Sequence, residues 1–273
     1  MIWLSDEPAH PASYDSVPNA GTEFEGIGAR PLIGTFPDGD GAAADQEAVG
    51  PQAFVIDTVA GGASLRVHYH VVDQFQYVAF GSGRVGGHEA TPGVVHYSDR
   101  LVPYGPIVEG GDGLVYLTLR ANVERSAWFM PESRIRLSDA RSASPVSSRR
   151  RNIVIDLTAV GLDGRGTWRP AMVDFDGLVV AVRDLSDGEQ ATTPHTSAPG
   201  AYLVVVSGCV SADAAPRPAG SVAWAVDGSD RAVVTGVGAT RLAWLQFPRR
   251  ATPLRAETSD EPGVRGTHDV ARA

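Results

Sequence analysis

The sequence predicts an all-β protein that contains two copies of one antiparallel β-domain. Three observations support this fold class. Short runs rich in valine, leucine and aromatic residues recur along the chain, segments rich in Gly, Pro, Asp and Ser separate them, and helical periodicity is scarce. Such a spacing of short strands and turn signals is typical of a β-sandwich or a β-barrel.

The first series of predicted strands follows a segment of different composition. Residues 5–50 are rich in Pro, Gly, Ala and Asp, so we expect residues 1–50 to form an extended arm with little regular structure. The first domain is then expected over residues 51–137. Its predicted strands are AFVIDTV (53–59), SLRVHYHVV (64–72), FQYVAF (75–80), GVVHYS (93–98) and GLVYLTLR (113–120).

A polar segment rich in Ser and Arg, residues 138–151, separates the first series from the second. We expect it to be a linker with its arginines in solvent. The second domain is expected over residues 152–250, and residues 251–273 have the composition of a disordered tail. The strands predicted for the second domain are NIVIDLT (152–158), GLVVAVRDL (177–185), AYLVVVSGCV (201–210), SVAWAV (221–226), RAVVTGV (231–237) and RLAWLQF (241–247).

The two series resemble each other in order, which indicates an internal repeat. YVAFGSGRV (77–85) can be placed over YLVVVSGCV (202–210), a shift of 125 from 77 to 202. At this shift His70 meets His195, whereas His68 meets Thr193 and Gln74 meets Pro199. One imidazole does not make a site, so we expect the second domain to be structural or to form a dimer.

Composition excludes several classes of function. All 23 basic residues are arginines, which excludes Schiff-base catalysis and the lysine of a P-loop. A net charge of −9 argues against a nucleic-acid partner. No apolar run approaches the roughly 18 residues of a membrane helix, and the first residues lack the features of a secretory signal. We expect a cytoplasmic protein with a small-molecule substrate, without nucleic-acid or membrane partners, as a monomer or homodimer.

The segment from 68 to 85, HYHVVDQFQYVAFGSGRV, carries polar side chains at strand spacing. His68 and His70 are two residues apart, so both imidazoles face one side of a strand. Gln74 and Gln76 face the same interior if the intervening residues form a tight turn. Two convergent imidazoles inside a small barrel suit a transition metal.

This segment resembles the first motif of the cupin superfamily, G-x5-H-x-H-x3,4-E-x6-G. Gly62, His68, His70, Gln74 and Gly81 occupy its defined positions, and the one departure is glutamine in place of glutamate. The resemblance implies two tandem cupin-type β-barrel (jelly-roll) domains, that is, a bicupin.

The second cupin motif, G-x5-P-x-G-x2-H-x3-N, is degenerate in this sequence. It begins at Gly93, but Asp99 and Leu101 stand where the family has Pro and Gly, and Tyr104 stands at the ligand histidine. In the family two His, one Glu and a further His hold a divalent transition metal. The resemblance therefore implies either such a metal, with Fe favoured and Mn, Ni, Cu or Zn as alternatives, or no metal at all.

The candidate metal ligands are His68, His70 and either Gln74 or His96. Three His with open positions would suit Zn, Cu or Fe. Tyr104 is interpreted either as a further ligand or as a hydroxyl of the pocket wall.

Three functions follow from these residues. The first is a metal-dependent enzyme acting on a small organic molecule, which the resemblance suggests to be of the oxygenase type. The second is a metal-free isomerase, cyclase or lyase in which His70 or His96 is the general base. The third is a bicupin that binds a small molecule without turnover. In an enzyme, we expect three further residues to bind and orient the substrate beside Tyr104, namely Gln76, Arg100 and Arg66.

Overall fold

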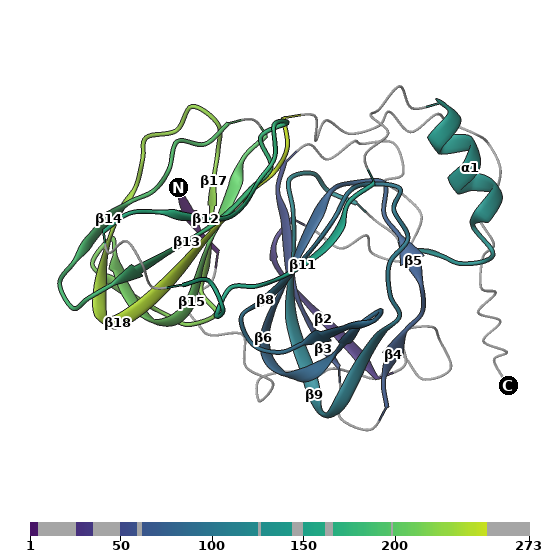
Figure 1. The fold of residues 1–273 in the computed structure, drawn as a ribbon, viewed down its shortest axis with the longest axis horizontal. Helices are drawn as coiled ribbons and strands as arrows, with labels where there is room; N and C mark the ends of the chain where they lie inside the picture. Colours follow the sequence, from purple (N-terminus) through teal and green to yellow (C-terminus); the bar gives the residue numbers. More distant parts are fainter. Residues whose placement is uncertain are drawn as a thin grey trace, which may run out of the picture.

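The computed structural model describes residues 1–4, 26–34, 50–58, 62–124, 127–143, 150–161, 166–197 and 199–249. Within these residues the chain is nearly all β, as predicted, and it forms two eight-stranded sheets and one two-stranded sheet. The two large sheets curl into two barrels that lie side by side (Figure 1). The tail predicted at 251–273 lies outside the described residues.

The first barrel contains one eight-stranded sheet, with the strand order β11-β8-β6-β9-β3-β2, and the two-stranded sheet β10-β5. Strand β4 also pairs with β9, and β7 pairs with β6. Its strands are β2 (Ile27–Ile33), β3 (Gln52–Thr58), β4 (Ser64–Leu65), β5 (His68–Tyr69), β6 (Gln74–Val85), β7 (His88–Ala90), β8 (Val94–Ser98), β9 (Ile107–Arg120), β10 (Trp128–Phe129) and β11 (Asn152–Asp156).

The second barrel has the strand order β1-β17-β15-β18-β13-β12, with β14 beside β18 and β16 beside β15. Its strands are β1 (Ile2–Trp3), β12 (Arg169–Val173), β13 (Val179–Leu185), β14 (Gln190–Thr192), β15 (Ala201–Ala212), β16 (Ala215–Pro218), β17 (Val222–Ala225) and β18 (Val233–Gln246).

The two strand orders are the same, which indicates a duplicated domain. The β-bulge in the middle of β6 and of β15 fixes the alignment. Gly81 and Gly208 both have φ of 76°, and an added Cβ would lie 2.1 Å and 2.3 Å from the carbonyl oxygens of Gly113 and Ala239. Only glycine fits there. The shift between the copies is therefore 127 (81 to 208), not the 125 expected, and His195 corresponds to His68.

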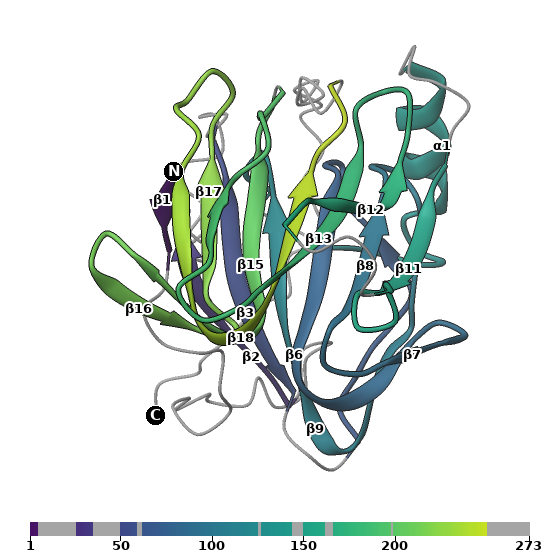
Figure 2. The same cartoon turned by 60° about the vertical axis from the view of Figure 1, so that its left-hand side comes forward.

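Each barrel is completed at one edge by a strand from outside its expected boundaries. Strand β1, from the predicted arm, pairs with β17 of the second barrel, whereas β11, expected to begin the second domain, pairs with β8 of the first (Figure 2). The arm also supplies β2 to the first sheet. The expectation of an extended arm with little regular structure over 1–50 is thus corrected where the chain forms β1 and β2, and the boundary expected at 152 is corrected by β11. The physical reason is that an open sheet edge leaves backbone N–H and C=O groups unpaired, and these strands pair them.

The predicted linker is partly helical. Helix α1 (Arg134–Ala143) covers its first residues, and Leu137 packs with Tyr69 and Leu101. Arg151, expected in solvent, is instead buried between the barrels. Its guanidinium pairs with Asp99 of the first barrel and with two carboxylates of the second, Asp174 and Asp176.

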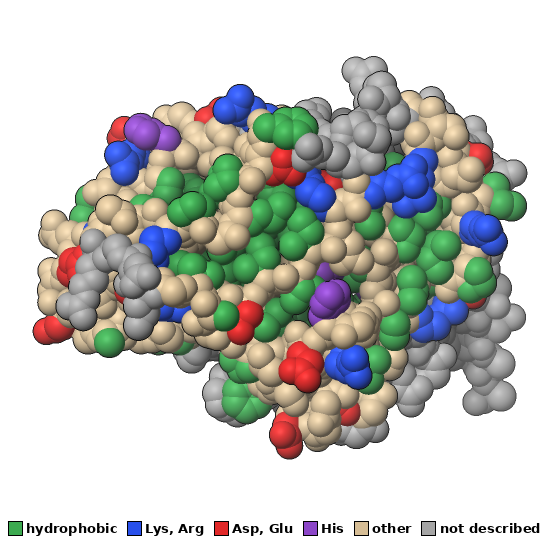
Figure 3. All heavy atoms as spheres, in the orientation of Figure 1, with side chains coloured by type: hydrophobic (Ala, Val, Ile, Leu, Met, Phe, Trp, Pro, Cys, Tyr) green, Lys and Arg blue, Asp and Glu red, His purple; other side chains and the backbone are tan. Residues whose placement is uncertain are grey.

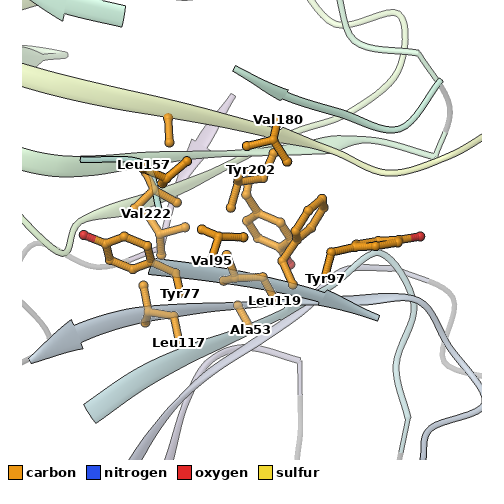
Figure 4. Packing of buried hydrophobic residues seen from close by; sticks show 14 of the residues in the cluster. Ala53, Tyr77, Val95, Tyr97, Leu117, Leu119, Leu157, Val180, Tyr202 and Val222 are labelled. Carbon is orange, nitrogen blue, oxygen red and sulfur yellow. The ribbon is translucent and has the colours of Figure 1, made fainter. Parts of the chain in front are cut away.

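The largest apolar cluster lies between the two barrels (Figure 4). Alternation along β6 sends Phe75 and Tyr77 into this cluster and sends Gln74, Gln76 and Val78 into the interior of the first barrel. The shared core thus fixes which face of each strand is left for a site.

Helix α1 is too short and too polar to cross a membrane, and no other helix among the described residues is long and apolar enough to do so. Acidic and basic side chains are interspersed on the face seen in Figure 3.

Candidate functional site

The sequence-predicted polar residues meet inside the first barrel. His68 lies on β5, Gln74 and Gln76 on β6, and His96 on β8, and all four side chains are buried. Tyr104 follows β8 and is held beside His68 by an antiparallel bridge, with N···O distances of 3.1 and 2.9 Å. The barrel thus collects side chains from three strands and a loop.

The Tyr104 hydroxyl is at the centre of this group. It lies 2.7 Å from His68 Nε2 and accepts hydrogen bonds from the amide nitrogens of Gln74 and Gln76. His68 Nδ1 lies 2.7 Å from the carbonyl oxygen of Arg66. Because a carbonyl oxygen only accepts, Nδ1 carries the proton and Nε2 accepts from Tyr104. Burial raises the pKa of Tyr104 well above its usual value, so the residue is a neutral phenol rather than a phenolate ligand.

A residue that sequence reasoning missed, Arg120, fills the adjacent space. Its Nε donates to Gln74 Oε1 at 3.1 Å, and its Nη1 donates to Gln52 Oε1 at 2.9 Å. Its Nη2 lies 3.1 and 3.2 Å from the two ring nitrogens of His70. The same Nδ1 lies 3.0 Å from Glu124 Oε2. The side chain of His70 is therefore in contact with a buried cation and with a buried carboxylate.

Burial, followed by the neighbouring charges, controls the protonation of the site. Arg120 is 4% exposed, and burial lowers its pKa, but a guanidinium stays protonated in proteins. The pKa of His68 falls to about 3, first through burial and then through His70 and Arg120, against the opposing effect of the Arg66 carbonyl. His68 is therefore neutral at physiological pH.

His96 is held at both ring nitrogens. Its Nδ1 lies 2.7 Å from Gln76 Oε1, and its Nε2 lies 2.7 Å from Asn152 Oδ1. Burial lowers the pKa of His96 to about 4, against the raising effect of Asn152. The ring is thus neutral and carries a single N–H.

A pocket opens into the first barrel above this polar group. Its free interior is about 10 Å³, which is room for about one water molecule, so a larger ligand requires the side chains of its walls to move. Gln76 and His96 form its floor, the exposed Glu89 stands at its mouth, and the remaining walls are apolar. Those walls are formed by Val78, Val85, Ala90, Val94, Ile107, Leu114, Tyr116 and Val154.

The residues in this arrangement do not fit a divalent metal. Two of the predicted ligands, His70 and Gln74, already face the guanidinium of Arg120. A divalent ion about 4 Å from that guanidinium would meet a repulsion of about 8 kcal/mol at an effective dielectric constant of 20. The described residues include no group of three or more His, Cys, Asp or Glu arranged to hold a metal ion.

The two arginines predicted to bind substrate lie elsewhere. Arg66 is 42% exposed and pairs with Glu132 at 3.0 Å. The backbone N–H of Arg100 donates to Asp73, and neither arginine belongs to the lining of the pocket. Of the predicted substrate-binding residues, Gln76 alone lines it, and the predicted catalytic residue His96 joins it there.

The second barrel carries apolar residues at the corresponding positions. Ala201, Leu203 and Ala223 correspond to Gln74, Gln76 and His96 at the shift of 127, and all three are buried. Trp244 fills the interior with them. The second barrel is therefore packed where the first is polar.

Comparison with known proteins supports the fold. No family model and no curated protein matches the sequence. Among solved structures, a candidate dioxygenase from Nostoc punctiforme has a TM-score of 0.53 at 9% identity, covering 75% of this chain and 71% of its own. A candidate glyoxylate-induced protein from Pseudomonas aeruginosa has a TM-score of 0.50 at 13% identity, covering 93% and 98%.

The chain has a bicupin fold. A further similar structure is that of a pirin from Escherichia coli in complex with nickel(II), with a TM-score of 0.46 at 10% identity, covering 82% of this chain and 93% of the pirin.

Proposed function

We propose that the first barrel of this bicupin binds a small, uncharged and largely apolar organic molecule, without a divalent metal. The observation that carries the proposal is the pocket, because its walls are apolar and its floor is a hydrogen-bonded pair, Gln76 and His96. Such a combination of apolar walls with a few placed polar groups is typical of small-molecule sites.

The lining argues for an uncharged ligand. Glu89 is the one charged residue among the lining residues, and it is exposed at the mouth. An anionic ligand would lose its hydration against apolar walls without gaining a cation. A hydroxyl or carbonyl group facing Gln76 would keep a hydrogen bond while the rest of the molecule lies against Val94, Ile107 and their neighbours.

A second candidate is metal-free catalysis on the same ligand. The neutral ring of His96 at the floor of the pocket favours it, because a neutral imidazole accepts a proton once its Nε2 exchanges Asn152 for the bound molecule. Gln76 Oε1 would then hold the Nδ1 proton and stabilise the imidazolium that forms. This corresponds to an isomerase, cyclase or lyase rather than to an oxygenase.

Ligand-observed NMR with a panel of small alcohols, ketones and lactones tests the binding proposal. Ile107→Trp would fill the pocket from β9. Val233→Trp is the matched control, because Val233 is the first residue of β18 as Ile107 is of β9, and it is 52% exposed.

We expect the wild type and Val233→Trp to bind the same compounds, and a folded Ile107→Trp to lose them. Equal binding by both variants would contradict the proposal. Carboxylic acids of the same shape should bind more weakly than the alcohols, and a preference for the acids would contradict the inference of an uncharged ligand.

A further inference from the structure

We propose that the guanidinium of Arg120 is a permanent internal cation that takes the place of the divalent ion in the first barrel, and that it orders the hydrogen bonds of the pocket floor. The proposal does not depend on which molecule the pocket binds. It assigns a role to a buried charge that the sequence motifs do not include.

Position is the first argument. Arg120 ends β9 directly opposite Gln74, its register partner on β6. The guanidinium contacts His70 and Gln74, which stand at ligand positions of the first cupin motif. Glutamine suits this arrangement, because its carbonyl oxygen accepts from Nε while the counter-charge comes from Glu124.

The surroundings of His70 are the second argument. A metal-bound histidine ordinarily donates its other N–H to a carboxylate, which fixes the ring and increases its basicity. Here His70 Nδ1 lies 3.0 Å from Glu124 Oε2, and Val71 N donates to Glu124 Oε1 at 3.0 Å. His70 is thus in contact with a carboxylate and with a cation, as a metal-bound histidine is, but both contacts are made by Nδ1 and the cation is the guanidinium of Arg120.

The direction of the hydrogen bonds is the third argument. Arg120 only donates, so Gln74 presents Oε1 to it and its amide nitrogen to Tyr104. The single proton of Tyr104 goes to His68, so Tyr104 accepts from the nitrogen of Gln76.

Gln76 must then present its oxygen to His96, whose Nδ1 carries the proton. His96 Nε2 faces Asn152 Oδ1, which cannot donate to it. Because oxygen and nitrogen of an amide have the same shape, we assign Asn152 the turned orientation, in which its nitrogen donates to Nε2. Arg120 thus sets the donor and acceptor pattern that a ligand meets at the floor of the pocket.

Gain of metal binding tests the replacement. The double variant Arg120→Met, Gln74→Glu removes the cation and restores the carboxylate of the motif. Mn²⁺ and Ni²⁺ are added separately, excess ion is removed by dialysis, and bound metal is measured by mass spectrometry, with electron paramagnetic resonance for Mn²⁺. Circular dichroism establishes that each variant is folded.

We expect the wild type to retain neither ion and the folded double variant to retain near-equimolar metal, which a further His68→Ala change removes. The proposal is overturned if the wild type retains near-equimolar metal that His68→Ala abolishes. A folded double variant that retains no metal also overturns it.

Chemical rescue keeps the proposal testable if the double variant does not fold. In Arg120→Ala, millimolar methylguanidinium should raise the unfolding midpoint by about 2–4 °C, whereas methylammonium should not. Arg66→Ala is the control, because that arginine is 42% exposed and lies outside the pocket. Equal responses of the two variants to methylguanidinium would overturn the proposal.

Discussion

Acid should destabilise this bicupin through His68 and His96, and the magnitude follows from their pKa values. Burial lowers these values to about 3 and about 4 in the folded chain, against 6.5 for an ordinary histidine. Below pH 6.5 these two histidines therefore bind protons in the unfolded chain but remain neutral in the native chain. The contribution of these histidines to stability is fully present above pH 6.5, and it is lost as the pH falls toward their pKa values in the folded chain.

Between the two pKa values of each histidine, the free energy of unfolding should fall by about 1.4 kcal/mol for each pH unit of acidification. At pH 5, which is 1.5 units below 6.5, His96 alone should thus lower the free energy of unfolding by about 2 kcal/mol relative to pH 7. Such a loss is a large fraction of the stability of an ordinary domain.

Urea unfolding of the wild type and of His96→Gln at pH 7 and at pH 5 measures this contribution. The variant should lose about 2 kcal/mol less stability between the two pH values than the wild type does. His88→Gln is the matched control, because His88 is exposed on β7. The reasoning is refuted if His96→Gln shows the same pH dependence as the wild type, or if His88→Gln alters it equally.

Three further predictions concern the network and the fold. The His96 ring should be protonated at Nδ1, and ¹⁵N-edited NMR showing an Nε2–H ring would contradict the direction derived for Gln76. Arg151→Ala should cost about 3–5 kcal/mol in urea unfolding, because it leaves Asp99 buried without its guanidinium, and a change within error would contradict this. Gly81→Ala should be poorly folded by circular dichroism, since its Cβ would lie 2.1 Å from a carbonyl oxygen, whereas Gly87→Ala, with nothing within 4 Å, should resemble the wild type.

The sequence predicted that the two barrels exist, but it did not predict the order of the strands within them. Alternation and turn signals are local, so they predict short strands. Which segment pairs with the open edge of a sheet depends on what else lies near that edge in the folded protein. Neither the two-residue strand β1 nor β11 has a sequence pattern that identifies its partner strand. Helix α1 was missed for a related reason, because Leu137 is its one buried residue.

The sequence by itself determined which side chains face the interior of the first barrel. The two-residue spacing of Gln74 and Gln76 places them on one face, and the cupin motif adds His68 and His70. Arg120 carries a weak signal of the same kind, because it lies on the inward face of its strand with Tyr116, but a charged residue at a strand end is usually solvated.

Only the tertiary structure decided what these side chains do. The register of β6 against β9 places Arg120 opposite Gln74, 46 residues away in the chain. Register depends on the packing of the whole sheet and on the shared core between the barrels, and local periodicity does not contain it. That pairing turned a predicted set of metal ligands into the hydrogen-bond partners of a buried guanidinium.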